Sequence, residues 1–294
     1  MVCGAGQRVK ARQPTAGNGA PFFPYPHWSC GWGTTVSGVK VVQHAPRSGV
    51  IWSGTTTVRA RPLPGSAHHG LLLITGSHGS DLSLPATDIL VDWLDTLREW
   101  GYHRIRTSAL SPSVADRLHD IGFTTVQDLV LLHREMNLPL PVAHENVGSI
   151  SSLRLRAPYS LLQKSVLHHL LDIDRMSFGD NWCMDEKSFH EALTATHKTK
   201  IFVMKINGEI VGFIIVGVTS TNAFIQRLAV HPDARRTGVA SQLLHTALTW
   251  IQKKHCTRVV VNTEILNHAA ISLYSHFDFS NMEHGLEVLE RELT

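Results

Sequence analysis

The sequence has no apolar run of about 18 residues, the length that a helix needs to cross a bilayer. Its N-terminus also lacks the apolar core of a signal peptide. Cysteine is scarce, and its spacing matches neither a zinc site nor a disulfide scaffold. These absences predict a cytoplasmic protein with reduced thiols. The four cysteines are Cys3, Cys30, Cys183 and Cys256.

The chain also lacks a run of basic residues, and its formal net charge of +3 is too small to indicate nucleic-acid binding. Its hydrophobic fraction of 43% is typical of a soluble globular protein. At 294 residues it is long enough for one large domain or two ordinary ones.

Histidine is frequent, with 19 copies, and two adjacent pairs occur at His68-His69 and His168-His169. Neighbouring side chains point to different sides of a helix or strand, and no His-x-x-x-His pattern with a carboxylate accompanies them. We therefore expect polar surface residues here and no metal site.

A strand, a tight turn and a helix follow one another near the middle of the second half. The apolar run Ala223–Val230 predicts a buried strand, which Pro232 ends. Apolar residues at helical spacing predict an amphipathic helix from Gly238 to about Lys254. A glycine turn at a helix start offers free N–H groups and the positive end of the helix dipole, so it suits a pyrophosphate. The turn consists of Arg235, Arg236, Thr237, Gly238, Val239 and Ala240.

Two better-known phosphate motifs do not fit this turn. It has no Gly-Lys-Ser/Thr, so it is not a P-loop, and it lacks the first glycine of a dinucleotide fingerprint. Its Arg-x-x-Gly-x-Ala pattern, preceded by Val-x-Pro, resembles the acetyl-CoA signature of the GCN5-related N-acetyltransferases (GNAT).

A second stretch strengthens the resemblance. Residues Asn267–Phe279 are similar to the family motif Asn-x-x-Ala-x-x-x-Tyr-x-x-x-Gly-Phe, with Asp278 in the place of the glycine. The resemblance implies an α/β fold with a mixed α+β sheet, the GNAT fold. It also implies an enzyme that transfers an acetyl group from acetyl-CoA to a primary amine, with no metal.

The resemblance assigns roles to particular residues. The backbone of Leu228, Ala229 and Val230 would pair with the pantetheine arm, and the Val230 N–H would polarise the thioester carbonyl. Asn267 would fix a helix start and hydrogen-bond near the cofactor, and Tyr274 would protonate the departing thiolate.

The general base is not readable from the sequence. Glu264, after the strand that follows the signature helix, is the candidate carboxylate. A water relay through backbone carbonyls is the alternative.

The first half repeats the order of elements of the second. Leu129–Met136 matches Leu286–Leu293, and Gly122-Phe123 matches Asp278-Phe279. Leu118 stands in the place of Tyr274, which predicts an inert, partial N-terminal copy beside a complete C-terminal one.

The sequence therefore divides into four predicted regions. Residues 1–48 form a poorly ordered N-terminal segment, 49–137 a degenerate GNAT-like domain, 138–149 a linker and 150–294 the catalytic domain. Ser113 is a candidate N-cap in the first copy and Asp185 in the second.

Acceptor choice is expected from the loop Phe178–Asp185 between two helices of the second copy. This loop loosely resembles that of ribosomal-protein alanine N-acetyltransferases, although Asn262 stands where those enzymes carry a carboxylate. The expected partners are acetyl-CoA and an amine on a small molecule or a peptide N-terminus, with a monomeric or homodimeric chain and neither nucleic acid nor membrane. The alternatives are a non-catalytic acyl-CoA sensor or interaction protein and a purely structural module.

Overall fold

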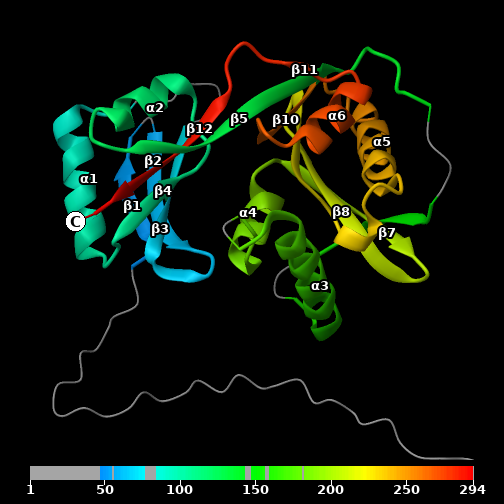
Figure 1. Ribbon diagram of the computed structural model, residues 1–294, viewed down its shortest axis with the longest axis horizontal. Coiled ribbons are helices and arrows are strands. Elements are labelled where there is room, and N and C mark those ends of the chain that lie inside the picture. Colours follow the sequence, from blue (N-terminus) through cyan, green and yellow to red (C-terminus); the bar gives the residue numbers. More distant parts are fainter. Residues whose placement is uncertain are drawn as a thin grey trace, which may run out of the picture. The chain divides into compact units, whose positions relative to one another are not determined.

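Figure 1 shows a computed structural model of the chain, in which residues 47–54, 56–76, 84–142, 147–155, 159–180 and 182–293 are described. Most of the predicted N-terminal segment lies outside these ranges, as do Cys3, Cys30 and residues 77–80 of a predicted loop. Within the described ranges, no helix is both long and apolar enough to cross a bilayer.

The first set of elements precedes the predicted linker. They are β1 (Gly49–Ser53), β2 (Thr56–Leu63), β3 (Ser66–Gly76), α1 (Thr87–Glu99), β4 (Arg104–Thr107), α2 (Pro112–His119) and β5 (Thr124–Glu135).

A second set of elements follows the linker. They are β6 (Ser149–Leu153), α3 (Leu161–Phe178), α4 (Glu186–Thr194), β7 (Lys198–Ile206), β8 (Glu209–Val218), β9 (Asn222–Val230), the 3₁₀ turn η1 (Pro232–Ala234), α5 (Val239–Gln252), β10 (Arg258–Glu264), α6 (His268–His276), β11 (Ser280–Asn281) and β12 (Leu286–Glu292).

Local residue choice explains where these elements begin and turn. Asn207, at a φ of 53°, and Gly208, at 88°, close the β7–β8 hairpin, as is typical of an Asn-Gly turn. Asp185 caps α4 by accepting from the Ser188 N–H, as predicted. The prediction of Ser113 as the cap of α2 is wrong, because Pro112 already occupies the first turn and Ser111 is the N-cap residue.

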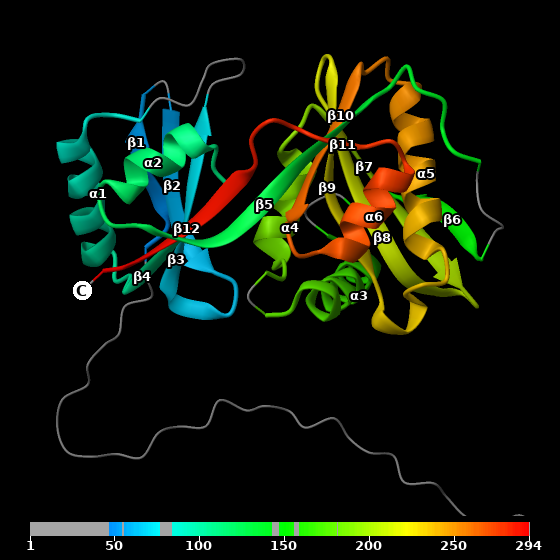
Figure 2. The same cartoon turned by 45° about the horizontal axis from the view of Figure 1, so that its top comes forward.

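The strands form one mixed sheet in the order β1-β2-β3-β4-β12-β5-β10-β9-β8-β7-β6. The order reveals an exchange: β12, the last strand of the second half, lies between β4 and β5. In return β5, the last strand of the first half, lies beside β10. The whole of β10, from Arg258 to Glu264, pairs with β5. Figures 1 and 2 both show β12 in red crossing from the second half into the sheet of the first.

Alternate residues of the central strands serve two separate cores. Met204 and Ile214 pack in the core that includes α5 and α6, whereas Val203 and Phe213 pack in the core that includes α3 and α4. The helices therefore cover opposite faces of β7 and β8. A third core in the first half is completed by Leu289 of β12, so the exchanged strand is needed to close it.

An arginine lies near the end of each exchanged strand, in the sequence His-Arg-Glu of β5 and Glu-Arg-Glu of β12. The arginine of β5, Arg134, links the two halves. Its side chain is 0% exposed. It donates from Nε to the Phe277 carbonyl at the end of α6 (2.7 Å) and from Nη2 to the carbonyls of Leu138 (3.2 Å) and Pro139 (2.7 Å). Burial lowers the pKa of Arg134, and nearby Asp278 opposes that shift. A residue of the first half thus closes a helix of the second.

We expect Arg134→Met to lower the free energy of unfolding by about 3 kcal/mol or more, because each buried carbonyl that loses its donor costs about 1–3 kcal/mol. The matched control is Arg98→Met, which removes an exposed pair with Asp95 and should change stability by no more than about 0.5 kcal/mol. Urea unfolding followed by circular dichroism measures both. Equal, small losses would show that Arg134 does not hold the halves together.

Candidate functional site

The site forms where two parallel strands separate. β10 pairs with β9 only at Arg258–Asn222, Val259–Ala223 and Val260–Phe224. From Ile225 onward, β9 has no ladder partner on that side among the described residues, whereas the other edge of β10 stays paired with β5. The separation leaves one edge of β9 open to an extended ligand, as the resemblance implies for a pantetheine arm.

A bulge marks the same part of β9. The register with β8 passes from Val216–Ile225 to Ile215–Arg227, so Gln226 is an extra residue in β9. Bulges change the direction of a strand and occur beside functional sites. Beyond it, Leu228 and Val230 are half-buried and Ala229 is buried.

The predicted phosphate turn lies at the end of β9 and opens α5. Gly238 is the N-cap residue, at a φ of 92°, and Arg236 has a φ of 64°. A Cβ at Gly238 would meet only Val147 Cγ1, at 3.9 Å, so the space above the turn is open. The first helical bond runs from the Gln242 N–H to the Gly238 carbonyl (3.0 Å), so the amides before it have no acceptor within the helix. The turn therefore fits a pyrophosphate.

The side chains of the turn have separate tasks. Arg235 donates to the carbonyls of Val230 (3.4 Å) and Met176 (3.3 Å), and the Thr237 hydroxyl donates to the Ala234 carbonyl (2.7 Å). Arg236 is exposed, the side chain of Val239 is buried in the core, and Ala240 is half-buried. Arg235 thus shapes the turn as well as adding charge to it.

Tyr274 lies on α6 and belongs to the same hydrophobic core as Val239, against which Leu228 and Val230 also pack. It is 4% exposed, and its ring packs on Phe279 at a centroid distance of 5.4 Å. Burial raises the pKa of Tyr274, which keeps its hydroxyl protonated. Asn267 caps α6 by accepting from the Ala270 N–H (3.1 Å), so the helix-start role is present.

Glu264 does not join this group. It is exposed at the end of β10, and its carboxylate accepts a hydrogen bond from the Gln127 amide of β5. The exchanged strand β5 thus brings Gln127 of the first half to the candidate base Glu264.

A buried ion pair beside the open strand was not predicted from the sequence. Arg227 donates to both oxygens of Asp174, at 2.6 and 2.8 Å, and to the Trp182 carbonyl at 2.7 Å. Asp174 is 0% exposed and also accepts from the Met184 N–H (2.7 Å). The signal was present, because Asp174 continues the apolar stripe of Leu167 and Leu170 at helical spacing.

This pair holds the loop Phe178–Asp185 against β9. The guanidinium of Arg227 lies 3.4 Å from the centroid of the Phe178 ring, and Arg106 of the first half stacks on Trp182 at 4.5 Å. Asn181 lies outside the described residues, and Cys183 is a free thiol in this loop. The predicted acceptor loop therefore touches both halves of the chain.

The histidine pairs have ordinary partners. His168 contacts Glu186 (3.0 Å), His169 contacts the Ile210 carbonyl (2.9 Å) and His69 contacts Glu290 (3.3 Å). Among the described residues, no group of three or more histidine, cysteine or carboxylate side chains is arranged to hold a metal ion.

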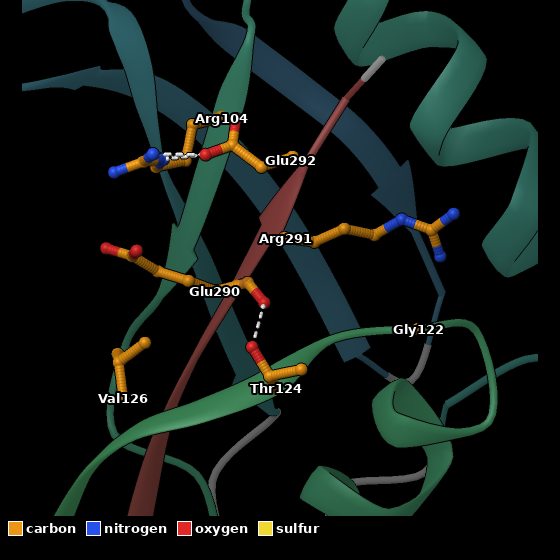
Figure 3. Close-up of a pocket in the computed structure, with 7 residues that line it drawn as sticks. All are labelled: Arg104, Gly122, Thr124, Val126, Glu290, Arg291 and Glu292. Atoms are coloured by element: carbon orange, nitrogen blue, oxygen red, sulfur yellow. Dashed lines mark hydrogen bonds and ion pairs between the residues drawn. The ribbon is translucent and has the colours of Figure 1, made fainter.

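A cavity of about 480 Å³ lies elsewhere, in the first half, where β12 passes the start of β5 (Figure 3). None of its lining residues belongs to the turn, to β9 or to α6, so this cavity is not the predicted acetyl-CoA site. Its lining residues are Arg104, Gly122, Thr124, Val126, Glu290, Arg291 and Glu292.

Sequence comparison matches residues 167–279 to the family described as "Acetyltransferase (GNAT) family". A Bacillus subtilis (strain 168) protein, named provisionally as ribosomal protein bS18-alanine N-acetyltransferase, is 22% identical over 125 residues, 42% of this chain and 82% of that protein. N-alpha-acetyltransferase 30 of Saccharomyces cerevisiae is 35% identical over 60 residues, 20% of this chain and 34% of that protein.

Two solved structures share the fold over both halves. A tandem GNAT protein from the clavulanic acid biosynthesis pathway aligns with a TM-score of 0.58 at 10% identity, covering 82% of this chain and 79% of that one. A GCN5-related N-acetyltransferase from Sphaerobacter thermophilus aligns with a TM-score of 0.53 at 16% identity, covering 81% and 77%. At these identities the likeness concerns the fold alone.

We expect Asp174→Asn to lower the free energy of unfolding by about 3 kcal/mol or more, because it leaves the largely buried Arg227 without its counter-charge. Asp172→Asn, at an exposed position of the same helix, is the control and should have little effect. Thermal and urea unfolding of both variants provide the measurement. Similar stabilities for the two variants would contradict a structural role for the pair.

Proposed function

We propose that the chain, whose residues 167–279 match the GNAT acetyltransferase family, transfers an acetyl group from acetyl-CoA to a primary amine. The observation that carries the proposal is the open edge of β9, which leads directly into a helix-start turn with left-handed φ at Gly238 and free space above it. An extended arm and a diphosphate need these two features side by side.

The proposed roles follow the geometry. The amides of the turn, from Arg236 to Ala240, bind the diphosphate, and Arg236 adds an exposed positive charge. The backbone of Leu228, Ala229 and Val230 pairs with the arm, and the Val230 N–H donates to the thioester carbonyl as negative charge develops on it. Asn267 fixes the start of α6, near the cofactor.

Proton transfer is the remaining requirement. Tyr274 is the proposed acid toward the leaving thiolate, on its place in the Asn267–Phe279 motif. Burial raises its pKa, so the phenol stays protonated but donates its proton less readily than a free tyrosine. Glu264 is the proposed base, positioned by Gln127, with a water relay as the alternative route. Asp174 is unsuited to that task because both of its oxygens are bonded to Arg227.

The acceptor class is proposed as an amine of a small molecule or a peptide N-terminus. Support for the peptide comes from the names of two relatives, a ribosomal-protein alanine N-acetyltransferase and an N-alpha-acetyltransferase. The alternative function is an acyl-CoA sensor. It is favoured because both carboxylates near the site, Asp174 and Glu264, already accept hydrogen bonds from other side chains. A thiol-release screen with acetyl-CoA over polyamines and Ala- and Met-starting peptides separates them: release indicates an enzyme, and binding without release indicates a sensor.

We expect Gly238→Asp to weaken acetyl-CoA binding by two orders of magnitude or more. A carboxylate about 4 Å from the diphosphate costs about 4 kcal/mol near a protein surface. Aspartate tolerates left-handed φ and caps helices well, and a Cβ meets no clash here, so the variant should still fold. Calorimetry measures the dissociation constant.

Gly208→Asp is the matched control for that experiment, because Gly208 also has positive φ and open space but lies in the β7–β8 hairpin. It should bind acetyl-CoA as the wild type does. Undiminished binding in folded Gly238→Asp would remove the turn from the site.

We expect Tyr274→Phe to bind acetyl-CoA within about twofold of wild type and to lose about 100-fold in kcat, the lower end of what a general acid contributes. Tyr159→Phe removes a different buried hydroxyl, one without a described partner, and should leave kcat unchanged. Steady-state thiol release with the best acceptor from the screen measures both. An unchanged kcat in Tyr274→Phe would exclude the phenol as the acid.

A further inference from the structure

The end of α3 and the loop that follows it lie against the open part of β9. The Ser177 hydroxyl donates to the Val230 carbonyl (3.1 Å), and Arg227 of β9 donates to the Trp182 carbonyl (2.7 Å). Because Val230 is the proposed partner of the thioester carbonyl, the loop Phe178–Asp185 is placed to meet an acceptor amine beside it.

The same loop and the helix after it also contact the first half. The guanidinium of Arg106, on β4, lies 4.5 Å from the centroid of the Trp182 ring. Arg61, on β2, donates to Glu191 of α4 at 2.9 Å. These two arginines are 9% and 4% exposed, respectively.

Both arginines belong to one face of the sheet of the first half. Their neighbours in sequence, Ile105 and Ala60, pack in the core that includes α1 and α2. Successive side chains of a strand point to opposite faces, so Arg106 and Arg61 project from the face opposite to that core. The loop Phe178–Asp185 and α4 of the second half therefore pack on this face.

Arg106 is itself held by the exchanged strand β12. Its Nε donates to Glu290 (2.5 Å), and the same carboxylate contacts His69 of β3 (3.3 Å). A planar guanidinium can pair with a carboxylate through its edge and stack on an aromatic ring through its face. The position of the Trp182 ring thus depends on strands of the first half.

The two halves hold different parts of the loop. The second half holds its backbone, because Arg227 bonds the Trp182 carbonyl and Asp174 accepts from the Met184 N–H (2.7 Å). The first half holds the Trp182 ring. Gly179, at the start of the loop, has a φ of 72°, and a Cβ there would meet nothing within 4 Å, so no packed side chain restrains the loop at this end.

We propose that Arg106 is a positioning residue for the acceptor. It holds the Trp182 ring in the orientation in which the loop Phe178–Asp185 binds the acceptor, while Arg61 holds α4, the next element, on the same face. The first half thereby sets the affinity for the acceptor and leaves acetyl-CoA binding to the second half. This role rests on the proposed acetyl transfer and adds a part for the first half in it.

The test compares Arg106→Met with Arg104→Met in the full chain. Arg104 lies on the same face of β4 and pairs with Glu292 of β12 in the same way, but its side chain is 49% exposed. We expect Arg106→Met to raise the KM for the acceptor about tenfold or more with kcat within about threefold, because binding shared by the bound and transition states is lost. Arg104→Met should leave both unchanged. Thiol release at varied acceptor concentration measures them, and calorimetry should show equal acetyl-CoA binding.

A double-mutant cycle shows whether Arg106 acts through the ring. Trp182→Ala should raise the KM for the acceptor by itself, and adding Arg106→Met to it should raise the KM no further, because contacting residues are not additive. Independent, multiplying effects would overturn the proposal, as would an unchanged KM in folded Arg106→Met. If Arg106→Met melts at a lower temperature than wild type, Arg106→Met with Glu290→Gln replaces it, since that pair leaves no unpartnered charge.

The position of the ring can also be measured without any reaction. Of the seven tryptophans, labelled with 5-fluorotryptophan, Trp182 is assigned in the ¹⁹F spectrum by the resonance that Trp182→Phe removes. We expect Arg106→Met to move this resonance and Arg104→Met to leave it in place. A resonance that stays in place in Arg106→Met would contradict the proposal. Thiol release with no acceptor by the wild type would instead contradict the proposed function, and the ¹⁹F spectra would still decide whether Arg106 holds the ring.

Discussion

The reciprocal exchange of β5 and β12 is the constraint on which the rest of the described fold depends. Each strand closes a core or a helix that belongs to the other half: Leu289 completes the core under α1 and α2, and Arg134 closes the end of α6. A buried guanidinium that satisfies several carbonyls at once is costly to remove, because every carbonyl would lose its donor. The two halves therefore share one continuous sheet.

The exchange also determines what lies beside the candidate site. Because β5 occupies the outer edge of β10, β10 can stay in the sheet while its inner edge separates from β9. The same strand brings Gln127 to Glu264, and β4 brings Arg106 to the ring of Trp182. A first half without an acetyl-CoA signature of its own can thus contribute to the second half's cleft by contact.

The Leu118–Phe123 hydrogen bond of the first half has a counterpart in Tyr274–Phe279, and the Arg104–Glu292 pair has one in Arg258–Glu135. The duplication itself stays a prediction. The division of the chain at residues 138–149 stays a prediction. The exchange means that a cut in the linker would separate each half from a strand that it needs.

The sequence by itself determined the order of elements and the identity of the turn, because both depend on local chemistry: proline ends β9, glycine permits a φ of 92°, and apolar spacing defines α5. Only the tertiary structure decided the strand exchange, the Asp174–Arg227 pair and the bond from Arg134 to the Phe277 carbonyl. These features join residues 53 to 188 positions apart, and no local pattern records which distant partner a charge or a strand edge will meet. Asp174 on an apolar stripe was the one visible sign, since a buried carboxylate must find a counter-charge somewhere in the fold.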